Sequence, residues 1–93
     1  MSTTDLLKTL ELRWKLEELR RLKSSISSTL REIELAREYL SKHADGRRIY
    51  RKLGDLIVEI TREEAEEYLE NAELGLKAQL STLEEEERKL SSG

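Results

Sequence analysis

The sequence contains no cysteine and no proline, and it has a single histidine, His43. Without cysteine there is no disulfide framework and no thiolate chemistry. Without proline, nothing forces a kink in a long helix. No apolar run approaches the roughly 20 residues of a membrane span, and the N-terminus lacks the basic start and apolar run of a signal peptide. We therefore expect a cytoplasmic protein that has no contact with membranes.

Amide side chains and aromatic rings are also scarce. Asn71 and Gln79 are the only residues of their types, and aromatic residues make up 4% of the chain. Charged residues make up 40%, a level typical of long helices that have one apolar stripe. Replacement of labile residues by ion-pairing ones is typical of thermophilic proteins. The net charge of −3 argues against nucleic acid as a partner.

Aliphatic side chains repeat every seven residues through the first half of the chain, which predicts a helix over residues 4–43. Its repeating members are Leu12, Leu19, Ile26, Ile33 and Leu40, with Leu16 and Leu30 between them. Lys23 and Arg37 occupy the two remaining positions of this stripe, which is therefore imperfect. A seven-residue period on a helix of 3.6 residues per turn predicts a left-handed coiled coil.

A second stripe predicts another helix over residues 62–91. Its members are Leu69, Leu76, Leu83 and Leu90, with Ala65 and Ala72 between them. Thr61 and Glu64 have the spacing of a capping box at its start. For the first helix we expect Thr3 or Thr4 as N-cap, and Gly46 in the left-handed conformation beyond its end.

The residues between these helices, 48–60, have the pattern of a β-hairpin. Gly54-Asp55 separates two β-rich runs and predicts a two-residue type II′ turn. This turn pairs Ile49 with Ile60 and Leu53 with Leu56. The two helices then pair antiparallel, with facing residues whose numbers add up to about 105–109. The first helix extends beyond the second in this arrangement, and Leu90 lies near Trp14 or somewhat later in the first helix.

A lone hairpin is marginally stable in water and has two open edges that can pair with further strands. One face carries Ile49, Leu53, Leu56, Val58 and Ile60, interrupted by Arg51. We expect that the coiled coil leaves this face uncovered. The hairpin is therefore predicted to assemble with other hairpins, through Ile49, Tyr50, Leu53, Leu56, Ile57, Val58 and Ile60.

The segment "ADGRRIYRKLGDLIVEITREEAEEYLENAELGLKAQL", residues 44–80, resembles the β-type subunit of prefoldin. Its most specific part is "IYRKLGDLIVEITREEA", a single hairpin that leads into a leucine-spaced helix. The resemblance implies a mainly α fold, an antiparallel two-helix coiled coil joined by one β-hairpin, in a single domain over residues 1–93. It also implies a hexameric, ATP-independent holdase without cofactors. In such a complex, hairpins from several subunits build a platform, and the coiled-coil ends hold unfolded proteins and pass them to a group II chaperonin.

By this resemblance, the client-binding ends of the coiled coil are residues 1–14 and 84–93, although the second helix is shorter than the family pattern implies. The exposed apolar residues predicted to contact clients are Leu6, Leu7, Leu10 and Trp14. Two other interpretations are that these residues pack against a neighbouring subunit, or that Trp14 packs on Leu90. A rival function is that of a structural adaptor in another complex, without client-holding activity.

Two further features of the sequence are candidate sites. Arg47, Arg48, Arg51 and Lys52 form a basic cluster, which could bind nucleic acid or an acidic partner, or could pair with Glu59 and with neighbouring hairpins. His43 has no convergent partners and is expected to interact with a helix end. No phosphate loop, nucleophile elbow or metal-ligand spacing is present in the sequence, so we do not expect an enzyme.

Overall fold

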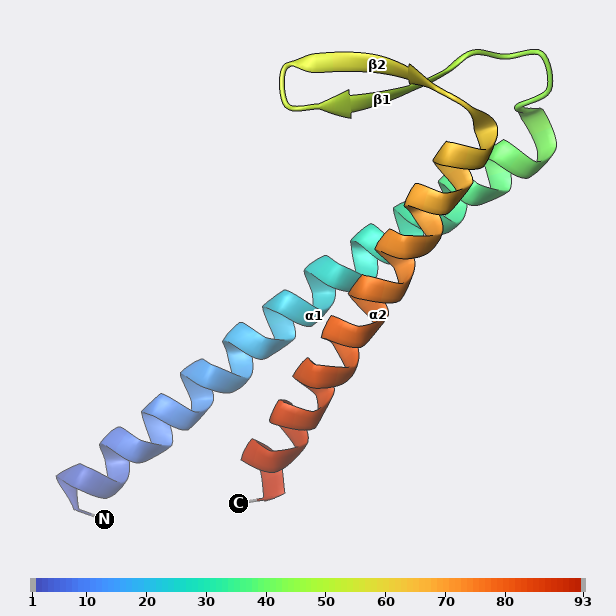
Figure 1. Cartoon of the computed structure of the whole chain (residues 1–93). Helices are drawn as coiled ribbons and strands as arrows, with labels where there is room; N and C mark the ends of the chain where they lie inside the picture. Colours follow the sequence, from blue (N-terminus) through green and yellow to red (C-terminus); the bar gives the residue numbers. More distant parts are fainter. Residues whose placement is uncertain (1, 93) are drawn as a thin grey trace.

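The computed structural model describes residues 2–92, which form two long antiparallel helices joined by one β-hairpin (Figure 1). The elements are α1 (Thr3–His43), β1 (Ile49–Leu53), β2 (Leu56–Ile60) and α2 (Arg62–Ser92). The hairpin lies at one end of the helix pair, and both termini point to the other end. The molecule is elongated, with extents of 67 × 27 × 15 Å. The predicted fold, a two-helix coiled coil with a single hairpin, is confirmed.

The start of α1 differs from the prediction, because Ser2 and not Thr3 or Thr4 is the N-cap. Ser2 has extended backbone angles (φ −77°, ψ 162°), and its hydroxyl accepts a hydrogen bond of 3.1 Å from the Asp5 amide. Thr3 already belongs to the helix, so its side chain cannot fill this role. At the other end, Gly46 has φ +73°, as predicted.

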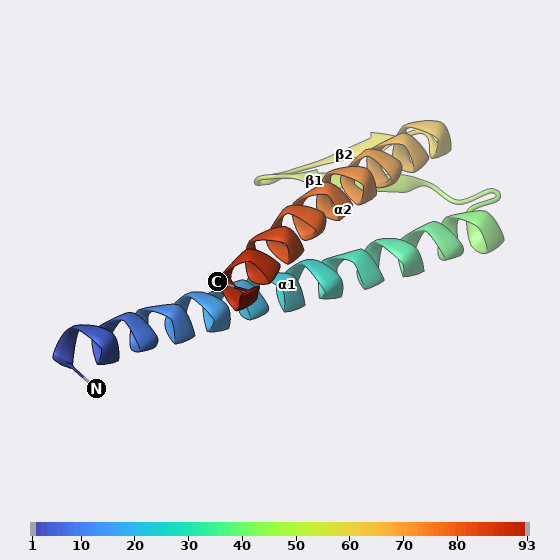
Figure 2. The same cartoon turned by 90° about the horizontal axis from the view of Figure 1, so that it is seen from below.

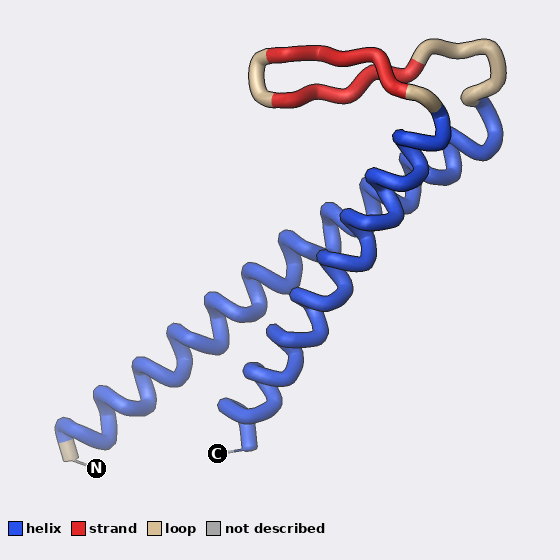
Figure 3. Tube along the Cα trace, in the orientation of Figure 1, coloured by secondary structure: helices blue, strands red, loops and turns tan. Residues whose placement is uncertain are grey.

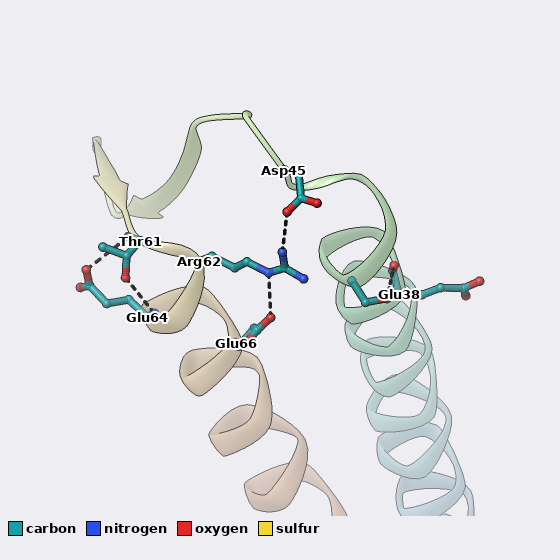
Figure 4. A network of polar contacts seen from close by, with 7 residues as sticks. Glu38, Asp45, Thr61, Arg62, Glu64 and Glu66 are labelled. Carbon is teal, nitrogen blue, oxygen red and sulfur yellow. Dashed lines mark hydrogen bonds and ion pairs between the residues drawn. The ribbon is translucent and has the colours of Figure 1, made fainter.

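The capping box at the start of α2 is confirmed. The Thr61 hydroxyl accepts from the Glu64 amide at 3.1 Å, and the Glu64 carboxylate accepts from the Thr61 amide at 3.2 Å (Figure 4). Two backbone donors that the helix itself leaves unpaired are thereby satisfied. Because this cap follows β2 directly, it fixes the point at which the hairpin returns into the coiled coil.

The two apolar stripes face each other along the helix pair. Leu19, Ile33 and Leu40 on α1 are buried, as is Ala65 on α2. Leu12, the first member of the α1 stripe, remains exposed. The buried positions therefore begin where α2 lies beside α1, and the coiled coil has a narrow core of aliphatic side chains.

The two cations in the α1 stripe each pair with a carboxylate of α2. Lys23 Nζ lies 3.6 Å from Glu87 Oε2, and Arg37 Nη1 lies 2.5 Å from Glu73 Oε2. Lys23 and Arg37 are two heptads apart, and so are Glu73 and Glu87. The two polar positions that interrupt the α1 stripe therefore each form an ion pair with α2. Both pairs belong to the same alignment of the two helices.

The hairpin has the predicted register, with Ile49 opposite Ile60 and Leu53 opposite Leu56. Gly54 has φ +59°, whereas Asp55 has no positive φ, which matches a type II′ turn with glycine in its first central position.

The position of the hairpin corrects the expectation that the coiled coil leaves its apolar face uncovered. Ile49 and Ile60, at the base of the hairpin, pack against the cluster formed by Leu40, Ala44 and Ala65. The hairpin lies on the α2 side of the helix pair (Figure 2), and in Figure 3 the strands fold back over the helices instead of continuing their axis. The short connection to α2 through Thr61 brings the base of the hairpin onto the helices.

Candidate functional site

The outer half of the hairpin carries the most exposed large apolar side chains of the described residues. Ile57 is 72% exposed and Leu56 is 68% exposed. Tyr50, Leu53 and Val58 are also exposed. The seven residues predicted for assembly therefore form two groups, because Ile49 and Ile60 already pack on the coiled coil and the other five remain accessible.

The backbone of the hairpin adds a second feature of an assembly surface. Within residues 2–92 the sheet has only two strands, so each strand has one edge without a strand beside it. An open edge next to exposed aliphatic side chains can pair with a strand from another chain. Polar backbone groups and apolar side chains are thus presented together at the turn end of the hairpin.

At the opposite end of the molecule, α1 extends past the end of α2 within the described residues (Figure 2). Leu6, Leu7 and Trp14 are exposed there, and Trp14 is 63% accessible. Leu10 is half-buried, which is less accessible than the sequence suggested. Leu7 and Trp14 are one heptad apart and so share one side of the helix.

Leu90 of α2 lies beside Lys15 and Leu19 of α1, where the three residues line a shallow hollow. This position agrees with the expectation that Leu90 falls somewhat later than Trp14 in the first helix. The side chain of Trp14 does not line this hollow.

The loop between α1 and β1 is tied to α2 by Arg62. Its Nη1 donates to Asp45 Oδ1 at 2.9 Å, and its Nε donates to Glu66 Oε1 at 3.1 Å (Figure 4). The hydrogen bond to Glu66, together with the charges of Glu66 and Asp45, raises the pKa of Arg62. This pair of contacts holds the loop close to the first turn of α2 and so helps to orient the hairpin.

The basic cluster is distributed over several contacts. Arg47 donates to the Tyr39 hydroxyl, Arg48 lies 4.0 Å from Glu59, and the Arg51 guanidinium lies 3.8 Å from the centre of the Tyr68 ring. The predicted pairing with Glu59 is therefore present for Arg48. Arg51 instead stacks on an aromatic ring of α2, a contact that sequence reasoning missed.

Arg48 and Arg51 also line a groove between the hairpin and the two helices. Its volume is about 520 Å³, and it is open to solvent on one side. Tyr39 from α1, Tyr50 from β1 and Tyr68 from α2 contribute its aromatic lining. No local pattern in the sequence indicates this groove, because its three tyrosines come from three different elements.

Residues 2–92 hold no group of side chains suited to a metal ion. No cluster of three or more histidine, cysteine, aspartate or glutamate side chains with the geometry of a metal site occurs there. In the same part of the chain, neither helix has an apolar stretch that would suffice to cross a membrane.

Comparison with known proteins identifies the family. The family described as "Prefoldin subunit" matches residues 4–93, nearly the whole chain. The chain belongs to the prefoldin subunit family. The resemblance of residues 44–80 to prefoldin is thereby confirmed and extends over both helices.

Individual prefoldin subunits support the assignment. The chain is 32% identical to the prefoldin beta2 subunit from Thermococcus strain KS-1, with a TM-score of 0.86 over 95% of this chain and 94% of that one. It is 27% identical to the prefoldin beta subunit of the same strain, with a TM-score of 0.82 over 96% of this chain and 79% of that one. The Thermococcus relatives agree with the thermophile-type composition.

A curated relative is the prefoldin subunit beta of Methanosarcina acetivorans, which is 31% identical over 70 residues. These residues are 75% of this chain and 60% of that relative, so the match spans less than two thirds of its length.

Proposed function

We propose that this prefoldin-family chain is a subunit of an ATP-independent holdase chaperone. In this proposal the hairpin joins the chain to other prefoldin-type subunits, and the free end of the coiled coil binds unfolded proteins. The two surfaces lie at opposite ends of an elongated molecule, so that assembly at one end leaves the other accessible. Neither role requires a nucleotide, a metal or a catalytic group.

The outer half of the hairpin supports the assembly role. Leu56 and Ile57 are exposed next to an open strand edge, a combination that soluble monomers normally avoid. Pairing with a second hairpin provides hydrogen-bond partners for the backbone groups of the open strand edge, and it removes these side chains from water. Burial of apolar area provides about 25 cal/mol per Å², so burial of these side chains contributes favourably to association.

The exposed end of α1 is the observation that carries the client-binding role. Leu7 and Trp14 are large apolar side chains on one side of a helix, and both are more than half exposed. A single contact of this kind is weak. Several such ends held on one platform bind one unfolded chain with an effective concentration that raises the overall affinity by orders of magnitude.

The same proposal places the protein in the cytoplasm and makes a group II chaperonin the acceptor of the held clients. The alternative is a structural adaptor, in which the hairpin assembles but the end of α1 contacts a fixed protein subunit. The two functions differ in whether exposed apolar residues at that end determine client holding.

A suppression assay with a heat-denatured client tests client binding. The variant Leu7→Ser, Trp14→Ser removes two exposed apolar side chains at the end of α1. The control Leu35→Ser, Leu74→Ser removes two side chains of similar exposure from the middle of the coiled coil, where Leu74 is 61% exposed. We expect the first variant to lose most of its suppression of aggregation and the control to retain it. Equal suppression by both variants and the unchanged protein would favour the adaptor.

Light scattering over a dilution series tests assembly separately. We expect the unchanged chain to form a closed oligomer, alone or with a second prefoldin-type subunit. Ile57→Lys introduces a charge at the most exposed large apolar residue of the hairpin and is expected to reduce the mass toward the monomer. Retention of the full mass by Ile57→Lys would exclude the outer hairpin as the assembly surface. The helical content measured by circular dichroism must stay constant in each variant.

A further inference from the structure

The groove between the hairpin and the helices combines aromatic, aliphatic and cationic side chains. Its charged lining consists of Arg48, Arg51 and Lys52, and no carboxylate lines it. This is unusual in a chain with 20 acidic residues and a net charge of −3. The aromatic lining comes from the three tyrosines, and aliphatic residues such as Leu40 and Ile49 complete it.

The cations of this groove are poorly neutralised by the chain itself. Arg48 has only a distant contact of 4.0 Å with Glu59, and both side chains are exposed. Arg51 has no carboxylate within 4.0 Å, and its Nε is buried without a hydrogen-bond acceptor among the described residues. Lys52 likewise has no carboxylate within this distance in residues 2–92. The charge of Arg51 is therefore not compensated by a carboxylate of the described residues, and a buried donor without an acceptor costs free energy.

Arg51 is also held in place for such an acceptor. Its guanidinium lies 3.8 Å from the centre of the Tyr68 ring, so that the ring supports one face of the planar group. Because Nε is buried, the terminal nitrogens of the stacked guanidinium are the donors that stay available for hydrogen bonds to a carboxylate. Glu64 and Glu67 line a separate hollow that Arg51 and Tyr68 also border, and neither lies within 4.0 Å of the guanidinium.

From these features we infer that the groove binds an acidic polypeptide segment that carries an aromatic or large aliphatic side chain. A carboxylate of the segment pairs with the guanidinium of Arg51, while the apolar side chain packs among Tyr39 and Tyr68. Lys52, on the other face of β1, adds positive charge nearby. This is a second binding site, far from the end of α1, and it does not depend on client holding. Nucleic acid fits less well, because a strand of phosphates carries one charge per nucleotide and needs a longer row of cations than this groove provides.

Fluorescence anisotropy with the full chain tests this inference directly. The probe is a labelled peptide that places one phenylalanine between pairs of glutamates, and its counterpart has glutamines in place of the glutamates. We expect the acidic peptide to bind, the glutamine counterpart to bind at least about tenfold more weakly, and added salt to weaken the acidic peptide. Equal binding of the two peptides would overturn the role of the cations.

Three variants localise the site, and two of them remove the same charge from different places. Arg51→Gln is expected to weaken the acidic peptide about tenfold, and Arg51→Lys to have an intermediate effect because the charge is kept but the planar fork is lost. Arg31→Gln removes an equal charge from an exposed pair with Glu34 on α1 and is expected to leave binding unchanged. Equal weakening by Arg31→Gln and Arg51→Gln would show that net charge, and not the groove, attracts the peptide.

Competition experiments exclude other occupants. A single-stranded oligonucleotide that displaces the peptide, and whose own binding is lost in Arg51→Gln, would overturn the inference in favour of nucleic acid. Peptide binding to Ile57→Lys alone, with none to the unchanged chain, would show that another copy fills the groove in the assembly. Because neither experiment measures aggregation of a client, failure here is distinguishable from failure of the holdase proposal.

Discussion

The guanidinium of Arg37 on α1 and the carboxylate of Glu73 on α2 form an ion pair across the interface between the helices. Lys23 and Glu87 form a second pair at 3.6 Å in the same register. Both cations belong to α1 and both carboxylates to α2. Association of two α1 helices through this stripe would bring like charges together, so the two pairs favour the antiparallel arrangement within one chain.

A charge swap tests this relationship. Glu73→Arg is expected to lower the midpoint of thermal unfolding, because it places a cation beside Arg37 and removes the partner of Lys77. Adding Arg37→Glu restores one interhelical pair and should recover part of the loss. The control Arg31→Glu, Glu34→Arg swaps a pair within α1 and should have little effect. Strictly additive effects of the two interhelical substitutions, measured by circular dichroism, would contradict the pairing.

The stability contributed by Glu73 depends on pH. Hydrogen bonds from Lys77 and Arg37 lower the pKa of Glu73 below its ordinary value of 4.5. The folded state therefore holds this proton less tightly than the unfolded chain, and the contribution is fully present above 4.5 and lost as the pH falls through the lowered value. The thermal midpoints of the unchanged chain and of Glu73→Gln should differ most near neutral pH and converge in acid. Glu70→Gln, at an exposed position of α2, controls for removal of a charge.

Leu40 connects the coiled coil to the hairpin and is only 9% exposed. Leu40→Ala is expected to lower the free energy of unfolding by about 2–4 kcal/mol, the usual cost of truncating a buried leucine. Leu35→Ala, at an exposed position of the same helix, should cost less than about 1 kcal/mol. Denaturant titrations at one fixed protein concentration measure both, since association also contributes to stability. Equal costs would mean that the cluster at the hairpin base is not a core.

The cap at Thr61 is predicted to be worth about 1 kcal/mol, the typical loss when an N-cap threonine becomes alanine. Thr61→Ala leaves the Glu64 amide without its acceptor. Thr29→Ala is the matched control, because the Thr29 hydroxyl only donates to the Ser25 carbonyl within α1 and alanine is the better helix former there. Denaturant titration should therefore show opposite signs for the two substitutions. A loss of the same size in both would refute the capping role.

Two glycines should respond in opposite ways to alanine. Gly75 lies inside α2 with nothing within 4 Å of the position that a methyl group would occupy, so Gly75→Ala should stabilise the chain by about 0.5–1 kcal/mol. The close packing that a helical glycine can signal is therefore absent at this residue. Gly54 has φ +59°, so Gly54→Ala should cost about 1–2 kcal/mol despite the open space around it. Thermal unfolding of the two variants distinguishes these outcomes, and destabilisation by Gly75→Ala would contradict the first.

The hairpin register was predictable because it depends on local chemistry. A two-residue turn with glycine in its first central position leaves one arrangement, in which Leu53 faces Leu56 and Ile49 faces Ile60. The stripes of the helices were predictable for a similar reason, since their period is a property of consecutive residues. The N-cap was predicted wrongly because Ser2, Thr3 and Thr4 are all good capping residues, and only the backbone angles decide among them.

The interhelical ion pairs lay within reach of the sequence but were missed. Lys23 and Arg37 stood out as polar positions in an apolar stripe, and Glu73 and Glu87 have the same spacing in the second helix. The expected register placed facing residues slightly differently, and an error of a fraction of a helical turn is enough to assign other partners. The equal spacing of the two cations in the first helix and of the two carboxylates in the second could have indicated these pairs.

The sequence by itself determined the two helices, the hairpin with its register, the capping box and the family of the chain. The helices, the hairpin and the capping box follow from periodicity, turn chemistry and residue spacing, which act over short distances along the chain, whereas the family was indicated by the resemblance of residues 44–80. Only the tertiary structure decided that Ile49 and Ile60 pack on the helices and that Arg51 stacks on Tyr68. It also decided that a groove lined by cations lies between the hairpin and the helices. These contacts depend on the angle at which the hairpin meets the coiled coil, and that angle results from packing between elements and not from any local pattern.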